Sequence, residues 1–226
     1  MAKFKSLFAL SLVGMALAAP YAAAHERGDI IMRAGLVTVD PHEESENIRL
    51  HGTGKLPGTS AGVNSDTQIG LNYLYMLTDH VGLEYLAATP FKHDAYARGL
   101  PGDLDGHLGT FKQLPPTVSL VYFPLSPYST VQPYVGAGIN YTYIFETKLG
   151  NSAESKGFKG LDMDNSIGWA VEAGVDYMLT DTLILNAQVR YIDINTTATT
   201  HLNGTKVSVD VDVDPMVYMV SLGYKY

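Results

Sequence analysis

The stretch that decides the fold is VQPYVGAGINYTYIF, residues 131–145, in which apolar residues alternate with small or polar ones. Val135 and Ile139 fall on one side of this alternation, and Asn140 and Thr142 fall on the other. Successive side chains of a β-strand point to opposite faces, so a period of two is the pattern of a strand. The stretch therefore predicts a strand with one apolar and one polar face.

The same alternation recurs along the rest of the chain and predicts eight strands. They are residues 28–39, 66–77, 81–88, 110–123, 131–146, 166–179, 183–194 and 206–226. The connections alternate in length, with long ones at 40–65, 89–109, 147–165 and 195–205 and short ones at 78–80, 124–130 and 180–182. Short hairpin turns make neighbouring strands antiparallel. An even strand count, with long loops at one end and tight turns at the other, is typical of a bacterial outer-membrane barrel.

Alternation alone also fits an exported soluble β-sandwich, in which the apolar faces would point inward. The 15 Tyr outnumber the 7 Phe and the single Trp and gather near strand ends, as at Tyr122 and Tyr191, which is typical of interfacial girdles. The polar faces are rich in glycine, which suits a narrow interior, and the last strand ends on Tyr226. We therefore predict an all-β fold, an eight-stranded antiparallel transmembrane β-barrel with four long extracellular loops and three short periplasmic turns.

The first 24 residues have the composition of a secretory signal. Lys3 and Lys5 precede an apolar run over 7–19, and Ala22-Ala23-Ala24 forms a small-residue cleavage site. We predict cleavage between Ala24 and His25. Residues 25–226 would then form a single barrel domain in the bacterial outer membrane.

Composition excludes several classes of function. The chain contains no Cys and has a formal charge of −8, which excludes Cys-ligated metals and argues against nucleic acid as a partner. A lipid hydrolase or acyltransferase on a barrel would need a Ser–His–acid set at the lipid-facing rim. None of the 7 His lies on a predicted barrel wall beside a Ser, so we predict neither an enzyme nor a cofactor.

In a chain without Cys, stretches rich in Asp, Glu and His are the candidates for a metal site. The first long loop contains His42, Glu43, Glu44, Glu46 and His51. A solvated acidic loop is the simpler interpretation of that cluster. Asp210, Asp212 and Asp214 alternate with valines in the last predicted strand, and a period of two is not a calcium-loop pattern. We therefore predict no metal site.

The apolar phase changes within the last predicted strand. Valines occupy odd positions from Val207 to Val213, whereas the apolar residues from Tyr218 to Tyr224 are even, with Pro215 between the two runs. Either a bulge at 214–216 switches the phase, or residues 206–213 project above the membrane.

The polar faces place several charged residues inside the predicted barrel, in the half nearest the short turns. These residues are Arg33, Glu84, Glu172, Asp176 and Arg190. Isolated charges in a narrow interior are costly, so we expect a paired network. One hypothesis is that the network plugs the floor of the lumen against water flow. The alternative is ordinary filling of a small barrel by ion pairs.

Nearer the long loops the same faces turn apolar. The residues concerned are Leu86, Ala88, Ile144, Ile192 and Ile194. They predict an apolar channel if the ligand is apolar, or simple filler below the loops. Leu114 is followed by Pro115 and Pro116, which cannot donate to a β-ladder. They predict a lateral opening towards the bilayer, or else only the start of a strand.

Six stretches in order resemble the OmpW/AlkL family of small outer-membrane barrels. They are residues 31–35 (IMRAG), 77–80 (LTDH), 114–117 (LPPT), 133–142 (PYVGAGINYT), 174–177 (GVDY) and 214–226 (DPMVYMVSLGYKY). The resemblance implies an eight-stranded barrel that passes small hydrophobic molecules through the outer membrane.

The same resemblance implies three partners. They are outer-membrane lipids, a small hydrophobic ligand, and the barrel-assembly machinery, which would recognise the C-terminal strand. The family typically closes with Arg-Phe, and the Lys225-Tyr226 end here keeps the aromatic residue. An alternative function is a structural or adhesion barrel that acts through its extracellular loops.

Overall fold

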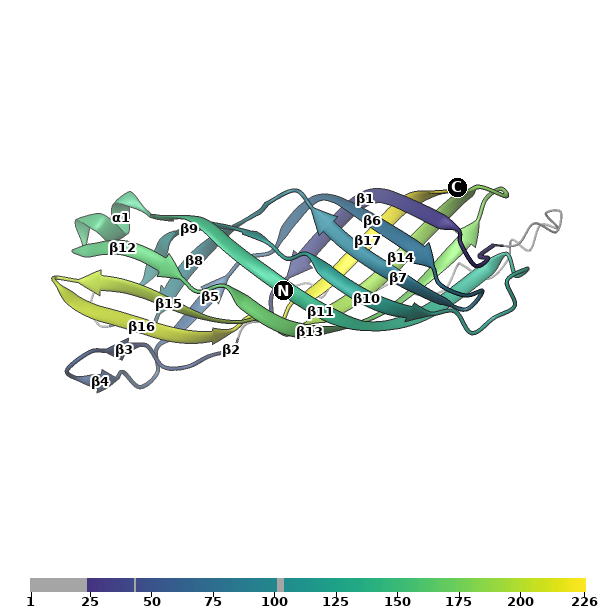
Figure 1. Ribbon diagram of the computed structural model, residues 1–226. Helices are drawn as coiled ribbons and strands as arrows, with labels where there is room; N and C mark the ends of the chain where they lie inside the picture. Colours follow the sequence, from purple (N-terminus) through teal and green to yellow (C-terminus); the bar gives the residue numbers. More distant parts are fainter. Residues whose placement is uncertain (1–23, 43, 101–103) are drawn as a thin grey trace, which may run out of the picture.

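The computed structural model describes residues 24–42, 44–100 and 104–226, and eight of its strands form a closed antiparallel barrel (Figure 1). They are β1 (Ile30–Asp40), β6 (Asp66–Met76), β7 (Val81–Ala88), β10 (Thr117–Tyr122), β11 (Val131–Leu149), β13 (Ser166–Met178), β14 (Leu183–Ile192) and β17 (Met216–Lys225). The first and last strands pair, with Gly35 opposite Ser221, and the ring closes where β10 pairs with β11. The predicted fold class is confirmed.

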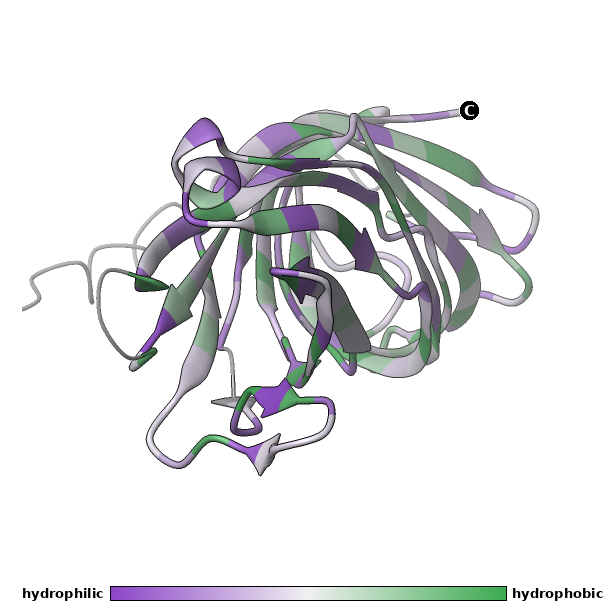
Figure 2. Cartoon of the chain, turned by 90° about the vertical axis from the view of Figure 1, so that its left-hand side faces the viewer, coloured by the Kyte–Doolittle hydropathy of each residue, from purple (hydrophilic) through white to green (hydrophobic). Residues whose placement is uncertain are grey.

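The barrel turns its apolar faces outward. Ile139 is 67% exposed and Ile167 is 74% exposed, whereas Asn140 and Thr142 are fully buried. A soluble sandwich would reverse these directions, so the alternative of an exported sandwich is wrong. Figure 2 shows the alternation as bands of opposite hydropathy along the strands. Among the described residues, no helix has the length and apolarity to cross a bilayer.

Tight turns join the strands at one end of the barrel. The backbone N–H of Leu77 donates to the carbonyl of Val81 at 2.8 Å, and that of Leu179 donates to the carbonyl of Leu183 at the same distance. The C-terminus lies at this end as well (Figure 1). The predicted signal peptide lies outside the described residues except for Ala24.

The four long connections are largely strands and not loops, which corrects the prediction. The connecting elements are β2 (Glu44–Ser45), β3 (Arg49–Leu50), β4 (Gly54–Lys55), β5 (Ser60–Val63), β8 (Phe91–Arg98), β9 (Gly106–Leu114), α1 (Asn151–Ser155), β12 (Phe158–Met163), β15 (Asn195–Leu202) and β16 (Thr205–Asp212). Strand β9 pairs with the last part of β11, from Tyr143 to Leu149, and β8 and β5 follow it in the same sheet, so these three strands continue the barrel wall past its rim. Strands β12, β15, β16, β3 and β4 form a second sheet. We call the two sheets beyond the barrel rim the extension.

Two predicted strands are each divided in the structure. The segment 110–123 becomes β9 and β10, which lie end to end along β11 with Pro115 and Pro116 between them. The segment 206–226 becomes β16 and β17, separated by Asp214, whose φ is 37°. Because β16 leaves the barrel and pairs with β15, the projecting alternative is correct and no bulge switches the phase.

Candidate functional site: the lumen and its openings

Strands β1, β7, β13 and β14 bring the five predicted lumen charges together in one buried cluster. Glu84 lies at its centre, with Oε2 3.2 Å from Arg33 Nη1 and Oε1 2.6 Å from Arg190 Nη2. Arg33 Nη2 lies 2.5 Å from Asp176 Oδ2, and Arg190 Nη2 lies 2.5 Å from Glu172 Oε2. The pairs Glu84–Arg190 and Arg33–Asp176 join strands that are not neighbours in the barrel, so the cluster ties four wall strands to one another.

Strand register and a glycine make room for this cluster. Glu172 and Arg190 are direct partners across β13 and β14, so their side chains point into the lumen at the same level. Gly223 is the partner of Arg33 on β17, and a Cβ at that position would lie 2.9 Å from Arg33 Cγ. A larger residue at 223 would therefore displace the Arg33 side chain.

Further polar residues, beyond the five predicted charges, complete the cluster. His25 Nε2 lies 3.0 Å from Asp176 Oδ2, and the His25 ring packs edge-on against Phe123. Asn72 Oδ1 accepts from Arg33 Nη1 at 3.0 Å, and Asn186 Nδ2 donates to Asp176 Oδ1 at 2.7 Å. Asn72 and Asn186 could have been found from their polar-face positions, whereas His25 precedes the first strand and gives no periodic signal.

The charges in this cluster do not cancel among the five predicted residues. Two guanidinium groups face three carboxylates, those of Glu84, Glu172 and Asp176. His25 adds a third basic side chain to the cluster, beside Asp176. The residue next to the predicted cleavage position therefore belongs to the same buried cluster.

Above the charged cluster the lumen is apolar and filled by side chains. Leu86, Ile192 and Ile194 pack with neighbours from other strands, and Ala88 contacts the edge of the group. The neighbours are Val37, Val39, Phe91, Ala170, Val211, Val213, Val217 and Met219. Ile144 is buried but lies outside this cluster, beside Gln113 of β9. We call the group the upper apolar cluster.

The wall of the barrel is incompletely paired beside Pro115 and Pro116. Strands β7 and β10 pair only up to Leu86 and Thr117, and β8 and β9 pair from Phe91 and Gln113 onwards. On the opposite side the contact with β11 is kept, because Tyr141 N donates to the Pro116 carbonyl at 3.1 Å and Leu114 pairs with Tyr143. The interruption is thus confined to one edge of the strand.

A small apolar cavity reaches from the lumen to this interruption. Its lining includes Leu86, Phe91 and Ile192 on the lumen side and Ala87 and Pro115 at the wall. Its volume is about 10 Å³, which is about the space of one water molecule. A larger molecule can pass only if side chains such as Phe91 move.

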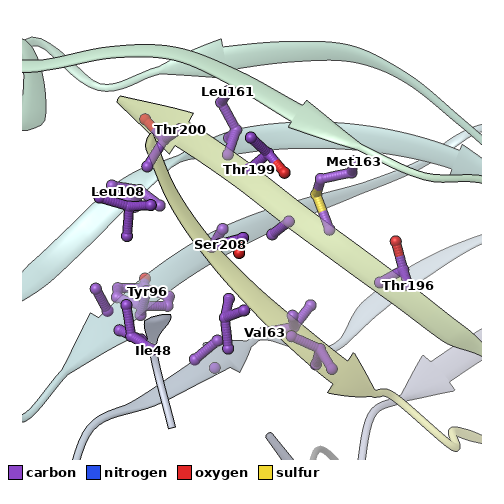
Figure 3. Close-up of a pocket in the computed structure, with 18 of the residues that line it drawn as sticks. Ile48, Val63, Tyr96, Leu108, Leu161, Met163, Thr196, Thr199, Thr200 and Ser208 are labelled. Atoms are coloured by element: carbon purple, nitrogen blue, oxygen red, sulfur yellow. The ribbon is translucent and has the colours of Figure 1, made fainter. Parts of the chain in front are cut away.

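The extension holds a second apolar cavity, which lies between its two sheets (Figure 3). Leu161 and Met163 of β12 and Leu108 of β9 line it, with Thr196 and Thr200 of β15 as polar edges. Its volume is about 50 Å³, below the 300 Å³ or more of typical ligand pockets, so it also must expand to take a ligand. This cavity was not predicted, because its lining comes from segments predicted to be loops.

The acidic stretches contain no assembled metal site in the part of the chain that the structure describes. Asp210 and Asp212 are exposed, and Asp214 accepts from the Tyr191 hydroxyl at 2.7 Å. Glu46 pairs with Lys55 at the surface, and Glu43 lies outside the described residues.

Known proteins resemble the chain over nearly its whole length. The model of the OmpW family matches residues 26–226. Outer membrane protein W of Vibrio cholerae is 42% identical over 205 residues, covering 90% of this chain and 91% of that protein. The crystal structure of the outer membrane protein OprG from Pseudomonas aeruginosa matches with a TM-score of 0.86 and 46% identity, covering 90% of this chain and 98% of that one.

A more distant relative carries a name with a metabolic context. The dibenzothiophene metabolism operon protein PahQ of Pseudomonas aeruginosa is 25% identical over 195 residues, covering 86% of this chain and 87% of that protein. The two closer relatives are outer membrane proteins, so the barrel lies in the outer membrane, as predicted. Barrels of this kind place short turns in the periplasm and long connections outside, so we expect the extension to lie outside the cell.

Proposed function

Because the chain belongs to the OmpW family of outer-membrane barrels, we propose that it is a passive conduit for small hydrophobic molecules. The molecules enter the cavity of the extension, move into the upper lumen, and leave sideways into the bilayer beside Pro115 and Pro116. The charged cluster forms a floor below this route and blocks straight flow of water to the periplasm. We propose no catalytic step for the barrel.

One observation carries this proposal: the upper apolar cluster connects the two cavities. Val211 and Val213 belong to that cluster and also line the cavity of the extension. Leu86 and Phe91 belong to it as well and line the small cavity at the wall. An apolar molecule on this route exchanges one apolar surface for another and never has to enter the charged floor.

The name of one relative adds support to the proposed conduit. PahQ takes its name from dibenzothiophene metabolism, and dibenzothiophene is a flat, apolar aromatic molecule. A molecule of that kind partitions into a bilayer, so release into lipid is a favourable end point. Because both cavities are small, the described conformation is a closed one, and passage requires side chains to rotate.

The experiment that tests the conduit measures uptake of an apolar fluorescent dye by cells with and without the protein. Ala198→Asp puts a charge into the cavity of the extension and should abolish the gain in uptake. His201→Asp, on the exposed face of the same strand, is the matched control and should leave uptake intact. If the unaltered protein gives no gain in uptake, the conduit is wrong and a structural or adhesion role replaces it.

A double variant tests the lateral exit. Pro115→Thr with Pro116→Thr restores two backbone N–H donors. The Pro116 carbonyl already faces β11, so the donor of residue 115 is the one that faces β7 and allows β7 and β10 to continue their ladder. We expect slower dye uptake at unchanged protein level in the membrane. Unchanged uptake would refute the lateral exit while leaving entry through the extension in place.

The floor is tested separately, by conductance in planar bilayers. Glu172→Ala and Arg190→Ala each remove one side of a buried ion pair across β13 and β14. We expect ion conductance to appear in both variants, because water can then enter the gap. Conductance that stays near zero in both would show that the charged cluster is filler and not a necessary barrier.

A further inference from the structure

Three lysines surround one groove on the outer face of the extension. Lys92 of β8, Lys112 of β9 and Lys148 of β11 line it together with Thr110 and Glu146, and Phe111 lies at its base. The groove has a volume of about 260 Å³. It faces away from the lumen, so it belongs neither to the proposed route nor to the charged floor.

Strand register places the three lysines on the same face. Lys92 is the direct partner of Lys112, and Lys148 is the partner of Thr110, two residues before Lys112. Direct partners in an antiparallel pair project to the same side, with Cβ atoms about 5 Å apart. Like charges in such positions are destabilising unless an anion lies between them.

The chain supplies only part of that negative charge. Glu146 Oε2 lies 2.8 Å from Lys112 Nζ. Among the described residues, neither Lys92 Nζ nor Lys148 Nζ has a hydrogen bond or an ion pair. The three lysines and Glu146 give the groove a formal net charge of 3 − 1 = +2, on a chain whose formal charge is −8.

The groove lies at the level of the outer aromatic girdle. Phe145 is the direct partner of Lys112 and stacks on Tyr143 with ring centroids 5.3 Å apart. Tyr143 is an outward-facing aromatic residue, 47% exposed, at the end of the lipid-facing band. Aromatic residues of this kind mark the boundary between acyl chains and headgroups. The ammonium groups of Lys92 and Lys112 thus lie where lipid headgroups begin.

We propose that this groove binds a phosphate group of an outer-leaflet glycolipid. Lysine recognises phosphate as a point charge with three rotatable donors, and several lysines around one groove suit the several oxygens of a phosphate. At this level the anion in reach is a headgroup, whose acyl chains would lie against the aromatic and apolar band below. The site is independent of what passes through the lumen.

Binding is tested by native mass spectrometry of the purified full-length protein. The protein is incubated in detergent with bis-phosphorylated lipid A, and the complex is then released from the detergent in the instrument. Lys92→Gln with Lys148→Gln removes two of the three lysine charges and keeps the Lys112–Glu146 ion pair. At about 1 kcal/mol for each of the two interfacial lysines, the double variant should bind lipid A about thirtyfold more weakly. The matched control is Lys159→Gln with Lys206→Gln, two exposed lysines of the second sheet, and it should bind like the unaltered protein.

Two further arms identify what the site recognises. Dephosphorylated lipid A should bind to the unaltered protein as weakly as bis-phosphorylated lipid A binds to the double variant. Lys92→Arg with Lys148→Arg should retain binding of bis-phosphorylated lipid A. Inorganic phosphate should not displace the lipid at equal concentration, because it lacks the acyl chains. Two results would overturn the proposal. One is equal binding of the phosphorylated and dephosphorylated lipid, and the other is a loss of lipid A binding in the control variant as large as in Lys92→Gln with Lys148→Gln. Displacement by inorganic phosphate would also overturn it and would assign the groove to a free anion.

Discussion

Replacing Arg190 by Met measures what the buried charges contribute to the barrel. Arg190 Nη2 lies 2.6 Å from Glu84 Oε1 and 2.5 Å from Glu172 Oε2, and all three side chains are almost completely buried. In the variant Glu84 keeps Arg33, but Glu172 loses its ion-pair partner and faces Glu84. Leaving one buried charge without its partner costs about 3–5 kcal/mol, so we expect a loss of that size in the free energy of unfolding.

Urea unfolding in lipid vesicles, followed by the fluorescence of Trp169, measures this free energy. A second variant, Arg190→Met with Glu172→Met, removes the pair as a whole and should recover most of the loss, since a buried pair replaced by apolar residues is often near neutral. Lys55→Met is the control at an exposed pair and should cost under about 1 kcal/mol. A cost below about 1 kcal/mol for Arg190→Met, or no recovery in the double variant, would refute the pairing described here.

Three further predictions concern single positions. Gly174→Val would place side-chain atoms against the Tyr134 ring and should lower the free energy of unfolding by about 1–3 kcal/mol in the same urea assay. Gly204→Val puts a β-branched residue at a φ of 86° in the β15–β16 hairpin, so tryptic cleavage at Lys206 should become faster. Burial lowers the pKa of His93 from its ordinary 6.5. Because the unfolded chain then binds a proton that the folded extension resists, hydrogen-exchange protection of β8 should fall as the pH drops below about 6.5, and His93→Gln should remove this dependence.

The sequence alone determined the barrel wall. A period of two is a local property, so the positions of Ile139 and Asn140 are enough to assign their faces once a strand is recognised. The short turns are also local, because hairpins of a few residues leave neighbouring strands only one way to pair. The direction of the faces required more, namely the predicted export signal and the tyrosines at the strand ends.

The long connections show where local patterns stop being sufficient. Asn203-Gly204 has the left-handed backbone of a two-residue hairpin turn, and this dipeptide was a readable signal for β15 and β16. By contrast, the pairing of β16 with β3 joins segments more than 150 residues apart. No local pattern specifies such a partner, so the second sheet and the cavity beneath it followed only from the tertiary structure.

For the barrel interior, too, alternation predicted the direction of side chains, whereas their contacts depended on the tertiary structure. The sequence placed Arg33, Glu84 and Arg190 on inward faces, because inward direction depends only on alternation. Which carboxylate meets which guanidinium, and that His25 joins them, depends on distances across the barrel. Whether the upper lumen is filled depends on the summed volumes of side chains from several strands. Packing of that kind is a property of the assembled barrel, and only the tertiary structure decided it.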